Sequence, residues 1–316
     1  MAAISLGTLS DIEKTYYIRE GLAIAKPNLI YKQFGMKERV PAREGKTAQW
    51  IRFTKLGRTS GSDFSGAADY VKNTTGAPPT WTPATPADTV VTAQLDAYFG
   101  KGVQWNEAVE YTALVDLPKE LRVIQYAQAA EVMEVETRDV IAAGSTVQYA
   151  NQKAARNLVT SADKIDLDDV IDLAVTLRNN DALRINGVFP VLCSVNTIAQ
   201  LMKDSAFRDA IQFQKDYMFT GEIVKLFGMR FLESSLAPTV SNSGSNNAVA
   251  TLEQTIALGD MSFGVTTWML DDFDMIYTPP GGHGDEWKVL NKLTWKMYYK
   301  AVILNQSWIA RLEHAR

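Results

Sequence analysis

The sequence predicts an α+β fold in which extended strands surround one long helix and one compact α/β unit. Residues 47–54 and 90–99 have strand character and enclose a segment rich in glycine and proline. Residues 118–144 carry apolar side chains at helical spacing, and residues 166–203 have the helix, strand, helix order of a compact α/β unit. The last quarter of the chain returns to the alternation that is typical of strands.

The composition is that of an ordinary globular protein. Its 316 residues are 46% hydrophobic, enough for one or two domains that remove about 75% of the unfolded surface from water. There are 36 acidic and 32 basic residues, and the net charge of -4 gives no electrostatic basis for gripping nucleic acid phosphates. We therefore expect no dedicated DNA-binding module.

The first strands of the chain need support from outside themselves. Residues 1–40 mix short apolar patches with glycine and proline, so we expect an arm that docks on another surface. Residues 47–54 and 90–99 are expected to pair as a long hairpin, and the segment between them is far longer than a usual hairpin loop. Because a two-stranded ribbon is only marginally stable in water, another part of the fold or a neighbouring molecule must stabilise it.

A long helix is predicted to begin at Pro118 and to end before Gly144, with about 26 residues and a length of about 39 Å at 1.5 Å per residue. Its apolar positions predict the buried face: Val123, Tyr126, Ala130, Met133 and Val140. Its charged positions predict a solvated face: Glu131, Glu134, Glu136, Arg138 and Asp139.

A second helix is predicted to begin after Asp166, a favourable N-cap residue. Its predicted core face consists of Leu167, Val170, Ile171, Ala174 and Leu177. Residues 188–195 are expected to form a buried strand that contains Cys193 as a small apolar residue, followed by a helix at residues 194–203. The nearby acids are interpreted as a helix N-terminal preference and a wet face: Asp163, Asp166, Asp168, Asp169 and Asp172.

Strands are predicted again towards the end of the chain. Residues 229–235 have strand composition, and residues 295–304 alternate between apolar and more polar side chains. Asn305 and Gln306 offer a turn into a short strand at residues 308–312.

Catalytic chemistry has few residues to use. With one cysteine and two histidines in the chain, a serine or cysteine triad is hard to assemble. His283 lies beside Asp285 and Glu286, and a metal site is one interpretation of this group, but a polar turn is the simpler one. We therefore expect no enzyme activity, no cofactor and no metal.

The order of these elements resembles that of a known protein family, and four segments of the sequence show the same resemblance. They are REGKTAQWIRFTKL at residues 43–56, LRVIQYAQAAEVMEVETRD at 121–139, GEIVKLFGMRFLES at 221–234 and YYKAVILNQSWIARLE at 298–313. In this order and these segments the chain resembles the major capsid proteins of tailed bacteriophages with the Hong Kong 97-type fold. The resemblance is strongest to the branch that includes the coliphage N-four major capsid protein.

The resemblance implies five parts: an N-terminal arm at residues 1–40, an extended loop at 41–96, a peripheral domain with a spine helix at 97–162, an axial domain at 163–260, and return strands of the peripheral domain at 261–316. It implies self-assembly, through hexamers and pentamers, into an icosahedral head shell that encloses double-stranded DNA without binding it specifically. The implied partners are a portal protein and decoration or scaffolding proteins, with no membrane. Because the chain has no signal-peptide pattern, we expect assembly in the host cytoplasm and a final place in the virion capsid.

In this family the extended loop lies across the adjacent subunit, so its large side chains are the candidates for contact between subunits: Trp50, Arg52, Arg58, Phe64, Tyr70 and Trp81. Two alternatives stay open. One is an encapsulin-like bacterial compartment shell, which uses the same fold. The other is a soluble α/β metal-dependent enzyme with its metal at His283.

Overall fold

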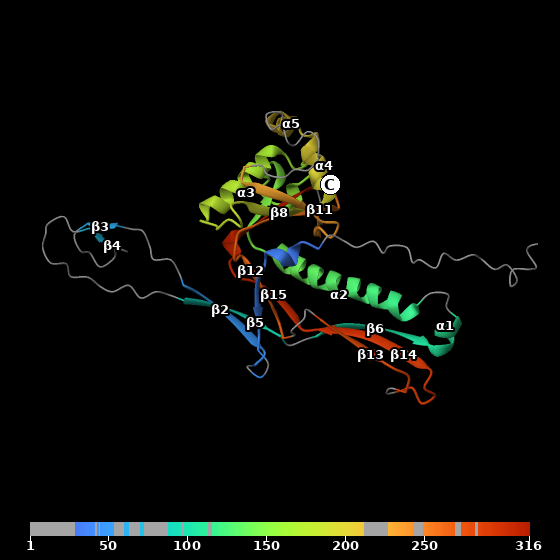
Figure 1. Cartoon of the computed structure of the whole chain (residues 1–316). Coiled ribbons are helices and arrows are strands. Elements are labelled where there is room, and N and C mark those ends of the chain that lie inside the picture. The colour runs from blue at the N-terminus through green and yellow to red at the C-terminus, as the bar shows by residue number, and fades with distance from the viewer. Residues whose placement is uncertain are drawn as a thin grey trace, which may run out of the picture.

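The helix predicted to begin at Pro118 lies at the centre of the subunit in a computed structural model (Figure 1). It is α2, Leu117–Ala142, and its 26 residues confirm the predicted length. Asp116 caps the helix by accepting the backbone N–H of Lys119, and Pro118 occupies the first turn. The structure describes residues 29–41, 43, 45–53, 60–62, 70–72, 88–95, 98–112, 116–211, 227–242, 249–268, 273–281 and 284–316.

The buried face of α2 differs from the predicted one. Val123 and Tyr126 are 38% and 53% exposed, although Met133 is buried as predicted. The buried positions are Gln125, Ala129, Met133, Glu134, Thr137 and Ile141. The amide Nε2 of Gln125 donates to the carbonyl oxygen of Leu293 at 2.8 Å. Ala130 and Val140 also pack against the core, so three of the five predicted positions face it. Polar side chains with such partners can be buried in place of apolar ones, which apolar spacing alone does not predict.

Glu134, predicted to be solvated, fastens the segment before the first strand to α2. Its two carboxylate oxygens accept the backbone N–H groups of Tyr31 and Lys32, the latter at 3.1 Å. These residues begin η2, Tyr31–Phe34, whose tyrosine is fully buried. Burial raises the pKa of Glu134, and the N–H donors of Tyr31 and Lys32 oppose that shift. A buried carboxylate with backbone donors thus anchors the described start of the chain.

Two three-stranded sheets pack against α2 and, with it, form what we call the elongated unit. One sheet has the order β13 (Asp274–Thr278), β14 (Leu290–Met297), β6 (Phe99–Asn106), and α1 (Glu107–Thr112) follows β6. The other has the order β1 (Met36–Arg39), β12 (Phe263–Thr267), β15 (Tyr299–Ile303). The predicted alternation is confirmed, because Trp295, Met297, Tyr299 and Ala301 are buried. The single strand expected at residues 295–304 is divided instead, since the chain changes sheets at Tyr298.

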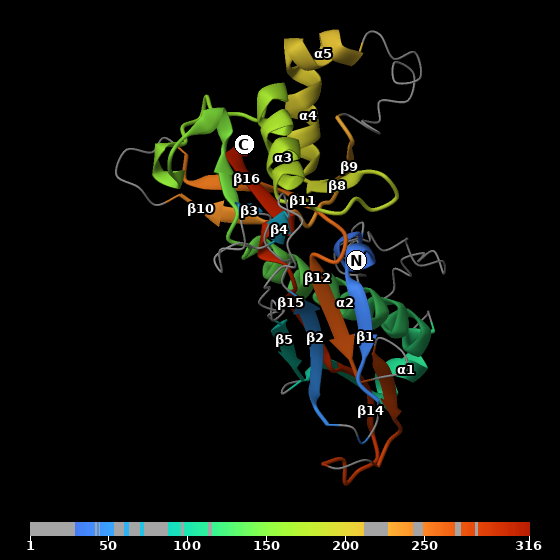
Figure 2. The same ribbon diagram turned by 90° about the vertical axis from the view of Figure 1, so that its left-hand side faces the viewer.

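A six-stranded sheet with three helices forms the α/β unit, which lies above the elongated unit in Figures 1 and 2. Its order is β7 (Val147–Tyr149), β16 (Ile309–Ala315), β11 (Thr251–Leu258), β8 (Phe189–Cys193), β9 (Met229–Glu233), and β10 (Thr239–Ser241) also pairs with β11. The helices are α3 (Leu167–Asn179), α4 (Val195–Lys203) and α5 (Ser205–Ile211). The predicted helix, strand, helix order is confirmed, with Asp166 capping α3 and Ser194 capping α4.

The core of the α/β unit confirms most of the predicted face of α3. Val170, Ala174 and Leu177 are buried, and Cys193 is a buried free thiol, as expected. Ile171 is only half-buried. Leu173, which was not predicted, occupies the core with 1% of its surface exposed.

Two acids near α3 are buried, which corrects the wet-face interpretation for them. Asp163 and Asp169 are each 4% exposed. Asp163 accepts the Nδ2–H of Asn151 at 2.9 Å and the backbone N–H of Thr160 at 2.7 Å, and Asp169 accepts the backbone N–H of Asn151 at 3.1 Å. These bonds hold the loop that contains η3 (Ala150–Gln152) and η4 (Arg156–Leu158). Backbone donors that lie elsewhere in the loop explain why the acids are inside.

The last strand does not return to the elongated unit. β16 pairs antiparallel with β11 from Ile309 to Ala315, and β7 pairs parallel with β16. The α/β unit therefore takes strands from both sides of the range 163–260, and the expected assignment of all of 261–316 to return strands is wrong for β16. β16 joins the α/β unit because its backbone hydrogen bonds cover what would otherwise be an open edge of β11.

Three short connections between the two units bond to one another. We call residues 143–146, 259–262 and 304–308 the neck; the last contains η5 (Gln306–Trp308). The N–H of Gly259 donates to the carbonyl of Trp308 at 2.8 Å, and the N–H of Leu304 donates to the carbonyl of Ser262 at 2.9 Å. The N–H of Ser145 donates to Oε1 of Gln306 at 3.0 Å. The neck is thus a single hydrogen-bonded structure.

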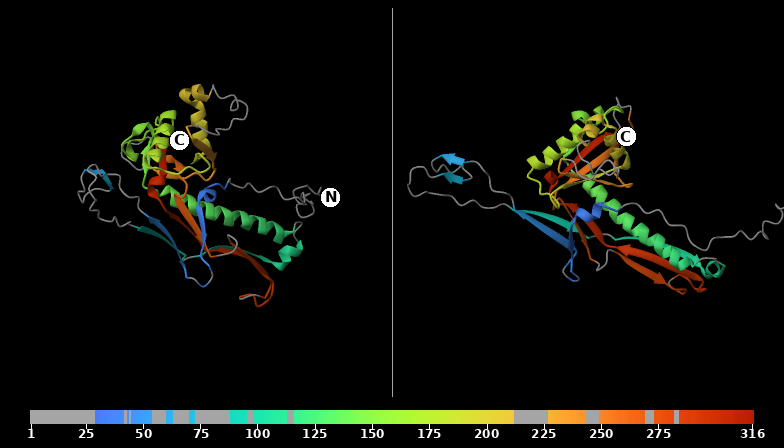
Figure 3. Two further views of the ribbon diagram at one scale, coloured as in Figure 1. Left: turned by 60° about the vertical axis from the view of Figure 1, so that its left-hand side comes forward. Right: turned by 45° about the horizontal axis from the view of Figure 1, so that its top comes forward.

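The predicted hairpin is present as a ribbon of two antiparallel strands, β2 (Thr47–Phe53) and β5 (Asp88–Gln94). The ladder runs from the Thr47–Gln94 pair to the Phe53–Asp88 pair. Further out, β3 (Ser60–Ser62) and β4 (Tyr70–Lys72) pair in parallel. Figure 3 shows the ribbon leaving the body of the subunit on the side away from β13 and β14.

Candidate assembly surface

The inner face of the ribbon is fixed to its own subunit. Ala48, Ala93 and Leu95 are buried and form a small core with Val40, and Trp50 packs against them. The indole of Trp50 also lies against β12, where a Cβ added to Gly264 would come within 2.9 Å of Trp50 Cζ2. Only glycine allows the ring to approach so closely. The base of the ribbon therefore has a defined position on the body.

The outer face of the ribbon is apolar and exposed. Ile51 is 61% exposed, Phe53 is 72% exposed and Val90 is 47% exposed. Ile51 is directly opposite Val90 in the ladder, and Phe53 follows Ile51 on the same face because side chains alternate along a strand. We call Ile51, Phe53 and Val90 the outer row. A row of this kind on a projecting ribbon is a surface that a second molecule can cover.

The predicted contact residues divide into four groups. Trp50 points inward and is part of the core of its own subunit. Arg52 is exposed and lies opposite Thr89, beyond the end of that core. Tyr70 belongs to β4, whose backbone pairs with β3. Three of the predicted residues lie outside the described part of the chain: Arg58, Phe64 and Trp81.

The outer row was missed, although the sequence contains a signal for it. In TAQWIRF the apolar residues fall on both faces, with Trp50 on one and Ile51 and Phe53 on the other. A strand that packs on one side only should be polar on its second face. Apolar residues on both faces indicate a second contact.

A polar hollow of about 250 Å³ lies between β7 and α3. Gln148, Lys153, Asp169 and Asp172 contribute to its wall. Burial, together with the neighbouring charge of Asp166, raises the pKa of Asp169 to about 7. The hollow therefore contains a carboxyl group that titrates near neutral pH.

Replacement of Asp169 by Asn is expected to flatten the pH dependence of stability. Because the folded-state pKa of about 7 lies above the ordinary value of 3.8, the contribution of Asp169 to stability is fully present below the lower value and is lost as the pH rises through the higher. The amide of Asp169→Asn keeps an oxygen for the N–H of Asn151 but cannot ionise. Urea unfolding measures the free energy of unfolding of both proteins at about pH 5 and about pH 8. The value for the variant, relative to that of the parent, should be larger at the higher pH. An equal difference at both pH values would contradict this assignment.

The metal interpretation gains no support from the described residues. Among them, no group of three or more histidine, cysteine, aspartate or glutamate side chains is arranged to hold a metal ion. His283 lies outside the described residues. Asp285 accepts the N–H groups of Gly281, Val289 and Leu290, so its oxygens are engaged in a turn. His314 is buried within β16, and burial lowers its pKa.

In the described part of the chain, no helix combines the length and the apolar character needed to cross a membrane.

Comparison with known proteins assigns the fold. The capsid structure of Cyanophage P-SCSP1u matches 98% of this chain and 94% of its own chain, with a TM-score of 0.69 and 14% identity. The capsid of Ralstonia phage GP4 matches 100% of this chain and 98% of its own, with a TM-score of 0.68 and 10% identity. The chain has the Hong Kong 97-type fold. The capsid of a native GTA particle matches 99% of this chain and 100% of its own, with a TM-score of 0.62 and 15% identity.

The Hong Kong 97-type fold and the α+β class expected from the sequence are thereby confirmed. No family model matches the chain, and no curated protein matches it either. At identities of 15% or less, these structures establish the Hong Kong 97-type fold, and function has to be argued from the surface described above.

Proposed function

We propose that the chain is the major capsid protein of a tailed phage, which self-assembles into an icosahedral head shell enclosing double-stranded DNA. The observation that carries the proposal is the outer row, an exposed apolar surface on a ribbon that projects from the body. The fold supports it, because solved chains with the same fold form the capsids of phages.

Covering the outer row with a second subunit would stabilise an assembly. Full burial of side chains such as Ile51, Phe53 and Val90 contributes about 1.5 to 3 kcal/mol each. The ribbon is fixed at its base by Trp50, so little ordering entropy is lost when a neighbour covers its outer face. Because each copy gives one ribbon and receives another, these gains add up around a ring and through a closed shell.

The same proposal includes the partners and the location. Copies of the chain form hexamers and pentamers, a portal protein occupies one vertex, and decoration or scaffolding proteins bind the shell. Assembly takes place in the host cytoplasm, and the finished protein resides in the virion. The net charge of -4 supports a shell that encloses the DNA without binding its phosphates. The four segments that resemble the family support the branch of the coliphage N-four major capsid protein.

Electron microscopy of particles purified from infected cells tests the function. A capsid should appear as closed shells that protect double-stranded DNA from nuclease. An encapsulin-like compartment would appear as closed shells that contain a cargo protein instead. A lone monomer would contradict both and favour the soluble enzyme.

Replacement of Phe53 by Asp is expected to weaken assembly without unfolding the subunit. Phe53 is 72% exposed in the subunit, so a carboxylate there costs little in the free chain but is buried in the contact. Size-exclusion chromatography should show subunits accumulating and shells decreasing by about tenfold or more. Gln49→Asp is the matched control, because Gln49 lies on the same face of the same strand and is already polar. Equal assembly of both variants would remove the outer row from the contact.

A further inference from the structure

In its described part, residues 279–281 and 284–289, the turn between β13 and β14 is organised by one buried carboxylate. The carboxylate of Asp285 is 6% exposed and accepts three backbone N–H groups: Gly281 at 3.0 Å, Val289 at 3.0 Å and Leu290 at 2.9 Å. Burial alone would raise the pKa of Asp285, but these three donors outweigh it and lower the pKa. These bonds constrain the backbone on either side of residues 286–288.

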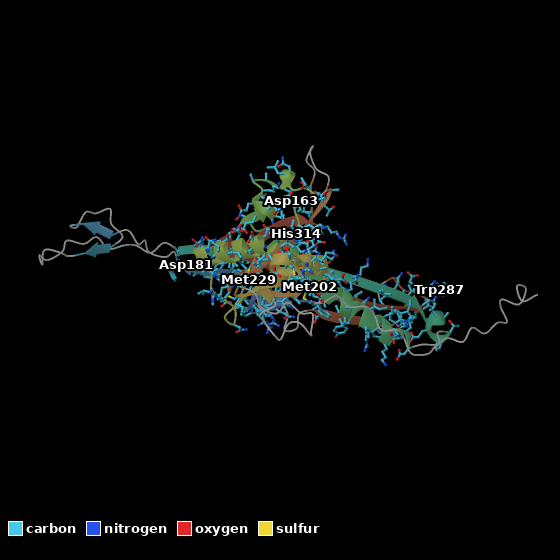
Figure 4. All side chains as sticks on the ribbon, turned by 90° about the horizontal axis from the view of Figure 1, so that it is seen from above. Asp163, Asp181, Met202, Met229, Trp287 and His314 are labelled. Carbon is cyan, nitrogen blue, oxygen red and sulfur yellow. The ribbon has the colours of Figure 1, made fainter. Side chains whose placement is uncertain are left out.

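Trp287 is the side chain that the turn presents. It is 87% exposed, and Figure 4 shows it at the end of the subunit opposite the ribbon. Glu286 and Lys288 flank it and are also exposed. The stem of Lys288 lies over Gly281, where an added Cβ would be 3.3 Å from its Cγ. The tip thus displays an acid, an indole and a base in a defined order.

This order is complementary to itself. When identical tips meet about a rotation axis, each residue i of one copy faces residue j of the next. The carboxylate of Glu286 can then meet the ammonium of Lys288 on the next tip while the indoles of Trp287 pack at the centre. Tryptophan is one of the residue types enriched at the positions that dominate a contact, because it buries a large area at little entropic cost.

The position of the tip distinguishes this contact from that of the ribbon. A contact in which one surface of each copy meets a different surface of the next generates a ring, and rings alone do not close into a shell. A second contact has to join ring to ring. Since the tip lies at the opposite end of the subunit from the ribbon, it is placed to meet a different neighbour.

We infer that Trp287 anchors a contact between identical tips of subunits in neighbouring rings, with a second copy of this chain as the partner. This inference rests on the proposed shell function and specifies which step of assembly the tip controls.

Replacement of Trp287 by Ala in the full chain tests the inference. The exposed indole does not pack in the core, so the variant should have the same melting temperature as the parent. Native mass spectrometry should still show rings of five or six copies, whereas the yield of closed shells should fall by about tenfold or more. Shells at the parental yield would overturn the inference. Loss of the rings as well would also overturn it, because the tip would then act within a ring.

A charge exchange tests whether the contact joins identical tips. Glu286→Lys alone places bases on both sides of the indole and should reduce closed shells, as Trp287→Ala does. The double variant Glu286→Lys with Lys288→Glu restores an acid and a base and should recover them. Failure of the double variant to recover shells would show that the tip meets a different surface. If the parent forms neither rings nor shells, the proposed function fails, a result separate from all of these.

Discussion

Removal of residues 54–87 is expected to leave a folded subunit that no longer forms stable shells. Phe53 and Asp88 are directly paired in the ladder, so a two-residue Asn-Gly turn can join them in the register that the ribbon already has. The base of the ribbon remains fixed by Ala48, Trp50 and Ala93. In the proposed assembly, the shortened ribbon keeps the outer row but lacks the length needed to reach across a neighbour.

Circular dichroism tests whether the shortened chain folds, and sedimentation tests whether it assembles into shells. The spectrum of the shortened chain should be close to that of the parent, while its sedimentation should show subunits or small oligomers in place of shells. Closed particles of parental stability would mean that the distal ribbon is dispensable and that the contact is made nearer the body. An unfolded spectrum would mean that the ribbon serves folding instead of assembly.

Leu173→Asp is expected to prevent the α/β unit from folding. Leu173 is 1% exposed and packs with Val170 and Leu177 in the core of that unit. An unpaired carboxylate buried there costs several kcal/mol, a large part of the roughly 5 to 15 kcal/mol by which most domains are stable. We expect the variant to accumulate as insoluble protein or to lose its cooperative melting transition.

Ile171→Asp is the matched control on the same helix. Ile171 is only half-buried, so its substituted carboxylate can reach water. This variant should remain soluble and should keep a cooperative melting transition, at a temperature below that of the parent. Leu173→Asp protein with the melting temperature of the parent would show that α3 does not pack by this face.

Local signals in the sequence predicted the elements well. Asp116, Pro118 and Asp166 act on the first turns of their own helices, so the starts of α2 and α3 could be placed from neighbouring residues alone. The pairing of the ribbon was also predictable from alternation, although the strand expected at residues 90–99 is β5, Asp88–Gln94, and Phe99 begins β6 in another sheet.

Distant partners explain what the sequence did not predict. Gln125 is buried because Leu293 offers a carbonyl, and Glu134 is buried because Tyr31 and Lys32 offer N–H groups more than a hundred positions away. No pattern within α2 contains this information. The outer row was visible as apolar residues on both faces of β2, but in the proposed assembly the surface that covers it belongs to another molecule.

The neck has a mechanical consequence for any assembly of this subunit. Where a single strand of chain joins two bodies, they can swing about it as about a hinge. Here three strands of chain cross side by side and are tied by hydrogen bonds, among them Gly259 to Trp308 and Leu304 to Ser262. Bending at this point would have to stretch one crossing and compress another. We therefore expect the subunit to behave as one rigid body, and the curvature of a closed surface to arise at the contacts between subunits.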